Sequence, residues 1–152
     1  MKTLTLALLF RDDKILLAMK KRKFGVGKWN GYGGKLEEGV TPIDGIIREV
    51  KEESNLDIPK ELFKELGSMD FYFDDKAEWN QRVVVYRVDD FVGEPEETEE
   101  MMPKWFPISE IPWDEMWKGD DQWIPYVIEN KHFAGTVHFS ENGEKLVSCV
   151  MK

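Results

Sequence analysis

The sequence predicts an α+β fold, an α/β/α sandwich in which a mixed β-sheet lies between helices. Apolar, β-favouring segments stand both before and after one amphipathic helix, and a second helical segment follows late in the chain. Strands on either side of a helix usually form a sheet that helices cover. A chain of 152 residues favours a single domain, which we expect to span residues 1–152.

The first elements are two strands and a glycine-rich loop. Residues 3–10 form a continuous apolar run, residues 11–14 are polar, and residues 15–19 form a second apolar run. This pattern predicts two strands joined by a tight connection. Residues 29–34 contain three glycines and predict a loop whose backbone can approach another group closely.

The central helix has clear start and stop signals. Thr41 is a good N-cap, Pro42 suits the first helical position, and Asp44 places an acid in the first turn. The helix is expected over residues 42–54, and Asn55 suits the left-handed conformation that ends many helices. Four apolar residues at helical spacing form its buried stripe: Ile43, Ile46, Ile47 and Val50.

The rest of the chain alternates between strands, polar connections and one more helix. In order, we expect strands at 69–73 and 82–88 around a polar connection at 74–81, an acidic loop at 91–100, a short strand at 105–108, a helix at 123–131, and a hairpin over 136–150 that turns at Asn142 and Gly143.

Charge and cysteine content limit the partners. The chain has 21 Lys and Arg against 30 Asp and Glu, a net charge of -9, which disfavours nucleic acid polymers and anionic membranes. No apolar run is long enough to cross a bilayer. The single cysteine, Cys149, fits a reducing compartment. We therefore expect a cytoplasmic monomer that binds small phosphorylated ligands through local cations or metal ions.

The most informative stretch is a row of acids in the central helix. Glu49, Glu52 and Glu53 are three and four residues apart and share one helical face. Such carboxylates repel one another, and hard divalent ions such as Mg²⁺ take oxygen ligands and bridge carboxylates to phosphates. The alternative is a solvated acidic face with salt bridges, for example from Asp44 to Arg48.

The stretch resembles the box of the Nudix hydrolases, Gly-x5-Glu-x7-Arg-Glu-U-x-Glu-Glu-x-Gly-U, where U is apolar. The matching positions are Gly34, Arg48, Glu49, Val50, Glu52, Glu53 and Leu56. Val40 replaces the first Glu of the box, and Asn55 replaces its second Gly. Asp44 is a candidate to replace the missing partner of Arg48, and the change at Val40 predicts reduced activity. The resemblance implies the Nudix fold.

Outside the box, the chain is similar to the oxidised purine nucleoside triphosphate diphosphatases of that family. The shared segments include residues 16–22, 29–35 and 131–135. This similarity implies Mg²⁺-dependent hydrolysis of a nucleoside triphosphate to the monophosphate and pyrophosphate, with Mn²⁺ as an alternative ion. The implied metal ligands are the Gly33 carbonyl and four acids, Glu49, Glu52, Glu53 and Glu100. Glu52, Glu53 and Glu100 are alternative acceptors for the proton of the attacking water.

The same similarity implies a base pocket. Trp117 would stack on the base, Lys20 would face the phosphates, and Thr5 and Asn30 would contact the nucleotide. The implied walls are Phe24, Phe71, Phe73, Met101, Trp123 and Phe139. For Phe71 and Phe73 simple core packing is the alternative, and Lys21 and Lys23 are read as dispensable residues of a solvated turn.

Two acids after Trp117 would read the donor edge of guanine. The family has acids two and three positions after this tryptophan, where this chain has Gly119 and Asp120, followed by Asp121. Carboxylates suit the N–H donors of guanine, and a close pair can share a proton. Asp120 and Asp121 are therefore candidate base contacts, and capping of the following helix is their alternative role.

The resemblance implies hydrolysis of triphosphates such as 8-oxo-dGTP, which would clear them from the nucleotide pool. Two other functions remain open from the residues. The chain could hydrolyse ordinary or methylated nucleotides, or it could bind nucleotides with little catalysis, as the change at Val40 suggests.

Overall fold

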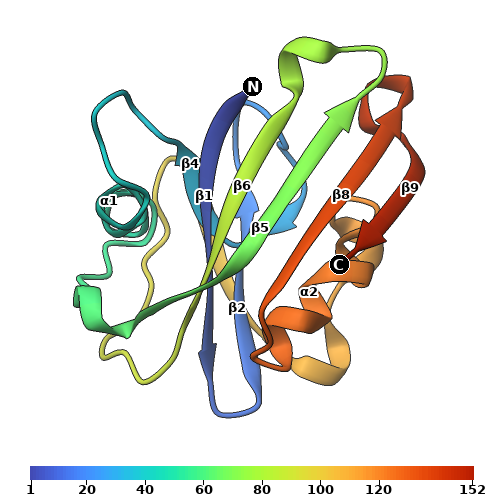
Figure 1. Ribbon diagram of the computed structural model, residues 1–152. Helices are drawn as coiled ribbons and strands as arrows, with labels where there is room; N and C mark the ends of the chain where they lie inside the picture. The colour runs from blue at the N-terminus through green and yellow to red at the C-terminus, as the bar shows by residue number, and fades with distance from the viewer.

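The computed structural model describes residues 1–152 and contains one curled mixed sheet with two helices (Figure 1). The strands run β3-β2-β1-β6-β5-β8-β9, with β4 paired to β1 and β7 paired to β2. Their bounds are Lys2–Arg11 for β1, Lys14–Lys20 for β2, Trp29–Asn30 for β3, Tyr32–Lys35 for β4, Phe63–Phe73 for β5, Gln81–Val88 for β6, Met101–Pro107 for β7, Phe133–Ser140 for β8 and Lys145–Met151 for β9.

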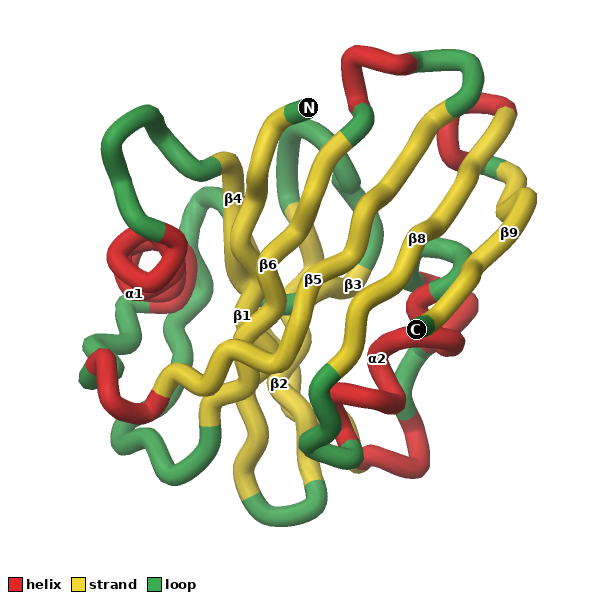
Figure 2. Tube along the Cα trace, in the orientation of Figure 1, coloured by secondary structure: helices red, strands yellow, loops and turns green.

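Two helices cover different parts of this sheet. Helix α1, Pro42–Ser54, lies beside β1 and β4, and helix α2, Asp120–Ile128, lies near β8 and β9 (Figure 2). The pairs β1–β6 and β5–β8 are parallel, and all the other strand pairs are antiparallel. The predicted α+β class, with a mixed sheet between helices, is confirmed. Neither helix has the length and apolar character needed to span a lipid bilayer.

Residues 6–10 of strand β1 form an unbroken apolar run because the molecule covers both faces of the strand there. Leu6 and Leu8 belong to the core on the α2 side, whereas Ala7 and Leu9 belong to the core on the α1 side. Side chains alternate along a strand, so a strand between two cores reads as a continuous apolar run. The two predicted N-terminal strands are confirmed, and Asp12, with a φ of 55°, turns the chain between them.

The prediction of a glycine-rich loop at residues 29–34 is wrong, because this segment forms β3 and β4. Strand β4 pairs antiparallel with β1, with Gly33 opposite Leu6 and Gly34 opposite Thr5. A β-carbon at Gly33 would lie 1.9 Å from the Thr5 carbonyl oxygen. The glycines do permit a close backbone approach, as expected, but the neighbour is strand β1.

Helix α1 has the bounds and caps that the sequence predicts. The Thr41 hydroxyl accepts a hydrogen bond from the Asp44 N–H at 3.3 Å. Asn55 has a φ of 62°, and its N–H donates to the Lys51 carbonyl at 2.9 Å. Ile46 and Val50 are fully buried on the α1 side of the sheet. These contacts hold the acidic face of the helix against β4.

Later elements are confirmed with shifted ends. Strand β5 begins six residues before the predicted strand at 69, β7 begins four before 105, and α2 begins three before 123. Gly119, with a φ of 95°, lets the chain enter α2 early, and Asn130, with a φ of 57°, follows its end. The predicted C-terminal hairpin is confirmed as β8 and β9, with Asn142 and Gly143 in its turn.

Candidate active site

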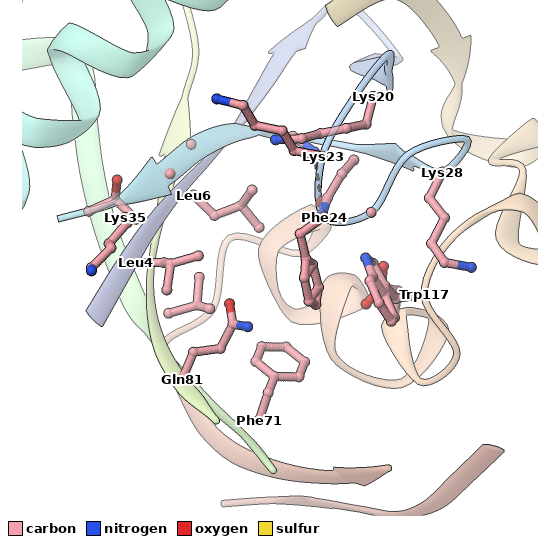
Figure 3. Close-up of a pocket in the computed structure, with 18 of the residues that line it drawn as sticks. Leu4, Leu6, Lys20, Lys23, Phe24, Lys28, Lys35, Phe71, Gln81 and Trp117 are labelled. Atoms are coloured by element: carbon pink, nitrogen blue, oxygen red, sulfur yellow. Dashed lines mark hydrogen bonds between the residues drawn. The ribbon is translucent and has the colours of Figure 1, made fainter. Parts of the chain in front are cut away.

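A cavity of about 330 Å³ opens between the sheet, the segment from Lys20 to Lys28, and the start of α2 (Figure 3). Of the substrate-contacting residues predicted from the sequence, all but one line it: Thr5, Lys20, Phe24, Asn30, Phe71, Phe73, Met101, Trp117, Asp120, Trp123 and Phe139. The exception is Asp121, which is exposed and does not line the cavity.

Aromatic rings form much of the cavity wall. Trp117 is half-buried and stacks on Phe24, with ring centroids 5.2 Å apart and planes 30° from parallel. Phe73 stacks on Phe139 at 5.1 Å, and the Phe71 and Phe139 planes lie within 6°. Phe71 and Phe73 line the cavity and also pack in the core. The structure therefore agrees with both predicted roles, cavity wall and core packing.

A buried hydroxyl at the cavity has no hydrogen-bond partner. Thr5 is 2% exposed, and its Oγ1 meets no donor or acceptor of the protein. Nearby, Asn30 Oδ1 accepts from the Gly31 N–H at 2.8 Å, which leaves the Asn30 amide hydrogens for other acceptors. Buried polar groups are normally paired, so an unpaired hydroxyl in a cavity wall suits contact with a polar ligand.

Asp120 is an acid within the cavity wall. Its Oδ1 accepts from Trp123 Nε1 at 3.1 Å, and the residue is 4% exposed. Burial raises the pKa of Asp120 to about 7, and the charge of Asp121 adds to this rise, whereas the Trp123 hydrogen bond and Lys28 oppose it. The N-cap of α2 is Gly119 and no side chain caps the helix, so Asp120 does not have the alternative capping role.

Lysines surround the cavity although the chain is acidic overall. Lys28 Nζ lies 5.0 Å from the Trp117 ring. Lys21 points elsewhere and donates to Glu97 at 2.7 Å. Lys23 is exposed, as expected for a lysine of a solvated turn, and it also lines the cavity. The lining lysines are Lys2, Lys20, Lys23, Lys28 and Lys35.

Two acids of α1 face β4, next to the cavity. Glu53 is buried, and its Oε1 accepts from the Gly33 N–H at 2.9 Å. A β-carbon at Gly34 would lie 2.9 Å from the Glu49 carboxyl group, so this glycine makes room for that acid. Glu52 has a largely exposed side chain 3.7 Å from Arg48. The helix therefore presents Glu49 and Glu53 inward and Glu52 towards solvent.

These acids share one electrostatic environment. Burial raises the pKa of Glu53 to about 8 against the Gly33 hydrogen bond, and Glu49 and Glu100 raise it further. Burial and then Glu52 raise the pKa of Glu49. A hydrogen bond from Arg22 lowers the pKa of Glu100, and the two atoms Arg22 Nε and Glu100 Oε1 are 2.9 Å apart. A cation bound near these carboxyl groups would offset the repulsion between their negative charges.

No three acidic or histidine side chains lie close enough in this structure to form a ready metal centre. The residues still suit a hard divalent ion, because their donors are carboxylate oxygens that repel one another next to a lysine-lined cavity. The Gly33 carbonyl belongs to the same strand that contacts Glu53. In this arrangement Arg22, Lys23 and Lys20 are the cations that lower the pKa of Glu100.

The partner of Arg48 differs from the prediction. Arg48 Nη1 donates to Glu37 Oε2 at 3.2 Å, and no contact joins Arg48 to Asp44. Glu37 comes three residues before Val40, which occupies the position of the first Glu in the box. The proposed substitution by Asp44 is wrong because the loop before α1 brings a different acid to the guanidinium.

Known proteins are similar to this chain in sequence and in fold. The sequence matches the NUDIX domain over residues 2–127. It is 41% identical to an "Oxidized purine nucleoside triphosphate hydrolase" of Danio rerio, over 91% of this chain and 86% of that protein. A Mus musculus protein of the same name is 39% identical over 90% of this chain and 86% of its own. A MutT protein of Bacillus halodurans has the same fold, with a TM-score of 0.81, 23% identity and coverage of 100% and 98%.

Proposed function

The chain belongs to the NUDIX domain family of hydrolases, and from that premise we propose that it hydrolyses oxidised purine (deoxy)nucleoside triphosphates such as 8-oxo-dGTP. The products would be the monophosphate and pyrophosphate. One observation carries the proposal: aromatic side chains, lysines and the two glycines that contact the acids of α1 all line the same cavity. Two relatives named for oxidised purine nucleotides support the substrate class.

The phosphates would bind between the lysines and the acidic helix. Lys20 and Lys23 supply positive charge at the cavity, and Glu49 and Glu53 lie behind β4. Mg²⁺, or Mn²⁺ in its place, would be held by Glu49, Glu52, Glu53, Glu100 and the Gly33 carbonyl. When bound, the ion would supply charge neutralisation for the phosphates and a polarised water. One of Glu52, Glu53 and Glu100 would accept a proton from the attacking water.

The base would occupy the aromatic end of the cavity. Trp117 provides a large ring for stacking, and Asp120 and Asn30 provide polar groups for the edge of the base. Asp121 is exposed, so the base site we propose contains one acid and not a pair. The proposal also includes a cytoplasmic, monomeric enzyme that removes damaged nucleotides before they reach DNA.

Pyrophosphate release tests the proposal. We expect faster release from 8-oxo-dGTP than from dGTP, dependence on added Mg²⁺, and loss of most activity in Glu53→Gln with an unchanged circular dichroism spectrum. Glu115→Gln changes an exposed acid away from the cavity and should behave like the wild type. Equal rates for both nucleotides would instead favour the second candidate, a hydrolase of ordinary or methylated nucleotides.

A weak nucleotide-binding protein is the third candidate, because Val40 lacks the carboxylate of the box. The Glu37–Arg48 contact argues against this candidate, because Glu37 gives Arg48 the acidic partner that Val40 lacks. Absence of pyrophosphate release from every nucleotide, together with retained nucleotide binding, would favour this third function.

Trp117→Ala should weaken binding of 8-oxo-dGMP by about 1 to 3 kcal/mol, the usual contribution of a stacking ring. Titration calorimetry with the purified variant measures this change. Trp105→Ala is the matched control, because Trp105 packs against Phe91 and does not line the cavity. Equal affinity in Trp117→Ala and wild type would make Trp117 a packing residue only.

A further inference from the structure

Gln81 is a polar residue in the aromatic and apolar part of the cavity wall. It is the first residue of β6, is only 8% exposed, and lines the cavity. In the sheet it lies opposite Phe71 of β5 and Lys2 of β1. Figure 3 shows its amide above the Phe71 ring, on the other side of the view from Trp117. No motif or spacing in the sequence assigns this glutamine a role.

Only one side of the Gln81 amide has a partner in the protein. Its Nε2 donates to the Trp79 carbonyl oxygen at 3.0 Å. A carbonyl oxygen can only accept, so the NH₂ group must face Trp79, and a rotated amide would bring two oxygens together. The amide oxygen of Gln81 therefore points away from Trp79, and no donor of the protein bonds to it.

The turn that fixes this amide is itself well held. The Trp79 ring packs edge-on against Phe24 and Phe73, with centroids 5.0 and 5.6 Å apart. The next residue, Asn80, accepts a hydrogen bond from the Phe73 N–H at 2.7 Å through its Oδ1. The Trp79 carbonyl is thus part of a packed turn, and the orientation of Gln81 is set before any ligand binds.

The second fixed acceptor, Asp120, lies on the Trp117 side of the cavity. Its N–H donates to the Trp117 carbonyl at 3.1 Å, and its carboxyl group accepts from Trp123. Two acceptors in different walls suit a flat ligand with N–H donors on two edges. Ordinary guanine carries N–H donors on its N1 and N2 edge only, since N7 is an acceptor. Oxidation at C8 adds an oxygen at C8 and places a hydrogen on N7.

We propose that Gln81 is a specificity-determining residue, whose fixed amide oxygen accepts a hydrogen bond from the N7–H that oxidation creates in 8-oxopurines. The proposal rests on the function proposed above and names the residue that reads the oxidation. With an ordinary purine, the same oxygen faces the lone pair of N7, and two acceptors in a site shielded from water repel each other. Rotation of the amide cannot relieve this, because it breaks the bond to Trp79.

Gln81→Leu tests the proposal, because it keeps the approximate size of the side chain and removes the acceptor. We expect the ratio of kcat/KM for 8-oxo-dGTP over dGTP to fall about ten-fold, the effect of one hydrogen bond in a shielded site. The affinity ratio of 8-oxo-dGMP over dGMP, measured by calorimetry, should fall by a similar factor. Gln122→Leu, which changes an exposed glutamine outside the cavity, is the matched control and should keep both ratios.

8-bromo-dGTP separates the N7 hydrogen from the size of the group at C8. It carries a large atom at C8 but keeps N7 as an acceptor, so the wild type should treat it like dGTP. A wild-type preference for 8-bromo-dGTP equal to that for 8-oxo-dGTP would overturn the proposal, because the cavity would then select bulk at C8.

Unchanged ratios in a folded Gln81→Leu variant would also overturn the proposal while leaving the proposed function intact. Should that variant unfold, Gln81→Met provides the same comparison with a more flexible apolar side chain. If the wild type itself shows no preference for 8-oxo-dGTP, the proposed function fails first, and the role of Gln81 fails with it. The two failures are therefore distinguishable in one set of measurements.

Discussion

At the scale of single residues, the protein keeps a carboxyl group where water has little access. Asp120 is buried against Trp123, and its pKa rises from an ordinary value of 3.8 to about 7, mainly through burial. Asp121 adds to the rise and Lys28 opposes it. The same two aspartates raise the pKa of Cys149, after burial, which is the larger cause. The start of α2 is thus a region in which folding changes proton affinity.

The proton on Asp120 links stability to pH. Between pH values near 4 and near 7 the folded chain holds a proton that the unfolded chain releases, so the free energy of unfolding falls as pH rises through this range. Asp120→Asn should remove this pH dependence, because an amide does not titrate. The amide oxygen can still accept the hydrogen bond from Trp123. We expect the variant to gain stability over wild type at about pH 8 and to gain less at about pH 5, as measured by urea unfolding.

The control for this measurement is Asp114→Asn, which changes an exposed acid in a short turn. It should follow the wild type at both pH values. A difference between Asp120→Asn and wild type that does not change with pH would show that the pKa of Asp120 does not carry the effect.

A second single-residue effect concerns the guanidinium of Arg48. Its partner Glu37 has an exposed side chain, so solvent screens the contact and its effect should be small. Glu37→Gln should therefore reduce kcat by roughly 1.5- to 5-fold with little change in KM. Adding Val40→Glu, which restores the box acid, should recover the rate.

Glu38→Gln is the neighbouring control, because Glu38 is exposed and forms no contact with Arg48. A double variant no faster than Glu37→Gln would argue against exchange of partners at Arg48. Full activity of Glu37→Gln alone would mean that Arg48 needs no acidic partner from this loop.

At the scale of secondary structure, the short strand β4 connects the sheet to the acidic helix. One edge of the strand pairs with β1, and its Gly33 N–H donates to Glu53 of α1. The next residue, Gly34, lies against the Glu49 carboxyl group. Any shift of this strand therefore moves the two inward acids relative to the cavity.

Substitutions at the two glycines of β4 should separate stability from catalysis. In Gly33→Ala the new methyl group would lie 1.9 Å from the Thr5 carbonyl, which is backbone, so β4 must leave β1. We expect a loss of about 3 kcal/mol in the free energy of unfolding. In Gly34→Ala the methyl group meets the Glu49 side chain at 2.9 Å, which can move. This variant should lose turnover while keeping more of its stability.

Urea unfolding and pyrophosphate release measure the two effects side by side. Equal stability of the two variants would contradict the rigid contact at Gly33. Wild-type turnover in Gly34→Ala would show that the position of Glu49 tolerates a displacement.

Local signals explain which elements could be predicted from the sequence. Helix α1 was predicted with its correct bounds because Thr41, Pro42 and Asn55 act within the helix itself. Strand β4 was missed because its glycines are unfavourable in strands, and only pairing with the distant β1 stabilises them there. The predicted start of α2 is too late because the helix begins directly after Gly119, and no capping side chain marks that position in the sequence.

The same distinction applies to the candidate site. The family resemblance predicted a large part of the cavity wall, including Trp117 and Asn30. Gln81 was missed because its role depends on the direction of its side chain after a tight turn. The partner of Arg48 was missed because helical spacing pointed to Asp44, whereas a contact from the preceding loop decides the geometry.

At the scale of the whole molecule, the distribution of charge is uneven. The chain has a net charge of -9, yet five lysines line the cavity. A local positive field attracts an anionic substrate even when the whole molecule repels it, and salt screens this attraction. We therefore expect the KM for a nucleoside triphosphate to rise with ionic strength.

Removing one of these charges should have a measurable effect. Lys23→Gln should raise KM about two- to five-fold and change kcat less, which is the scale of one partly exposed charge contact. Lys64→Gln removes an exposed charge on β5 outside the cavity and serves as the control. Steady-state kinetics at low salt give both constants, and equal KM values in the two variants would exclude a role for Lys23 in binding.

The cavity wall consists of two kinds of residue with different freedom to vary. Phe73, Trp123 and Phe139 belong to the main apolar core, so the wall they form cannot be altered without weakening the whole domain. Gln81 and Asn30 lie outside that core. Over evolutionary time, and in laboratory selection, new substrate preferences should therefore arise first at these two positions, while the aromatic wall stays constant.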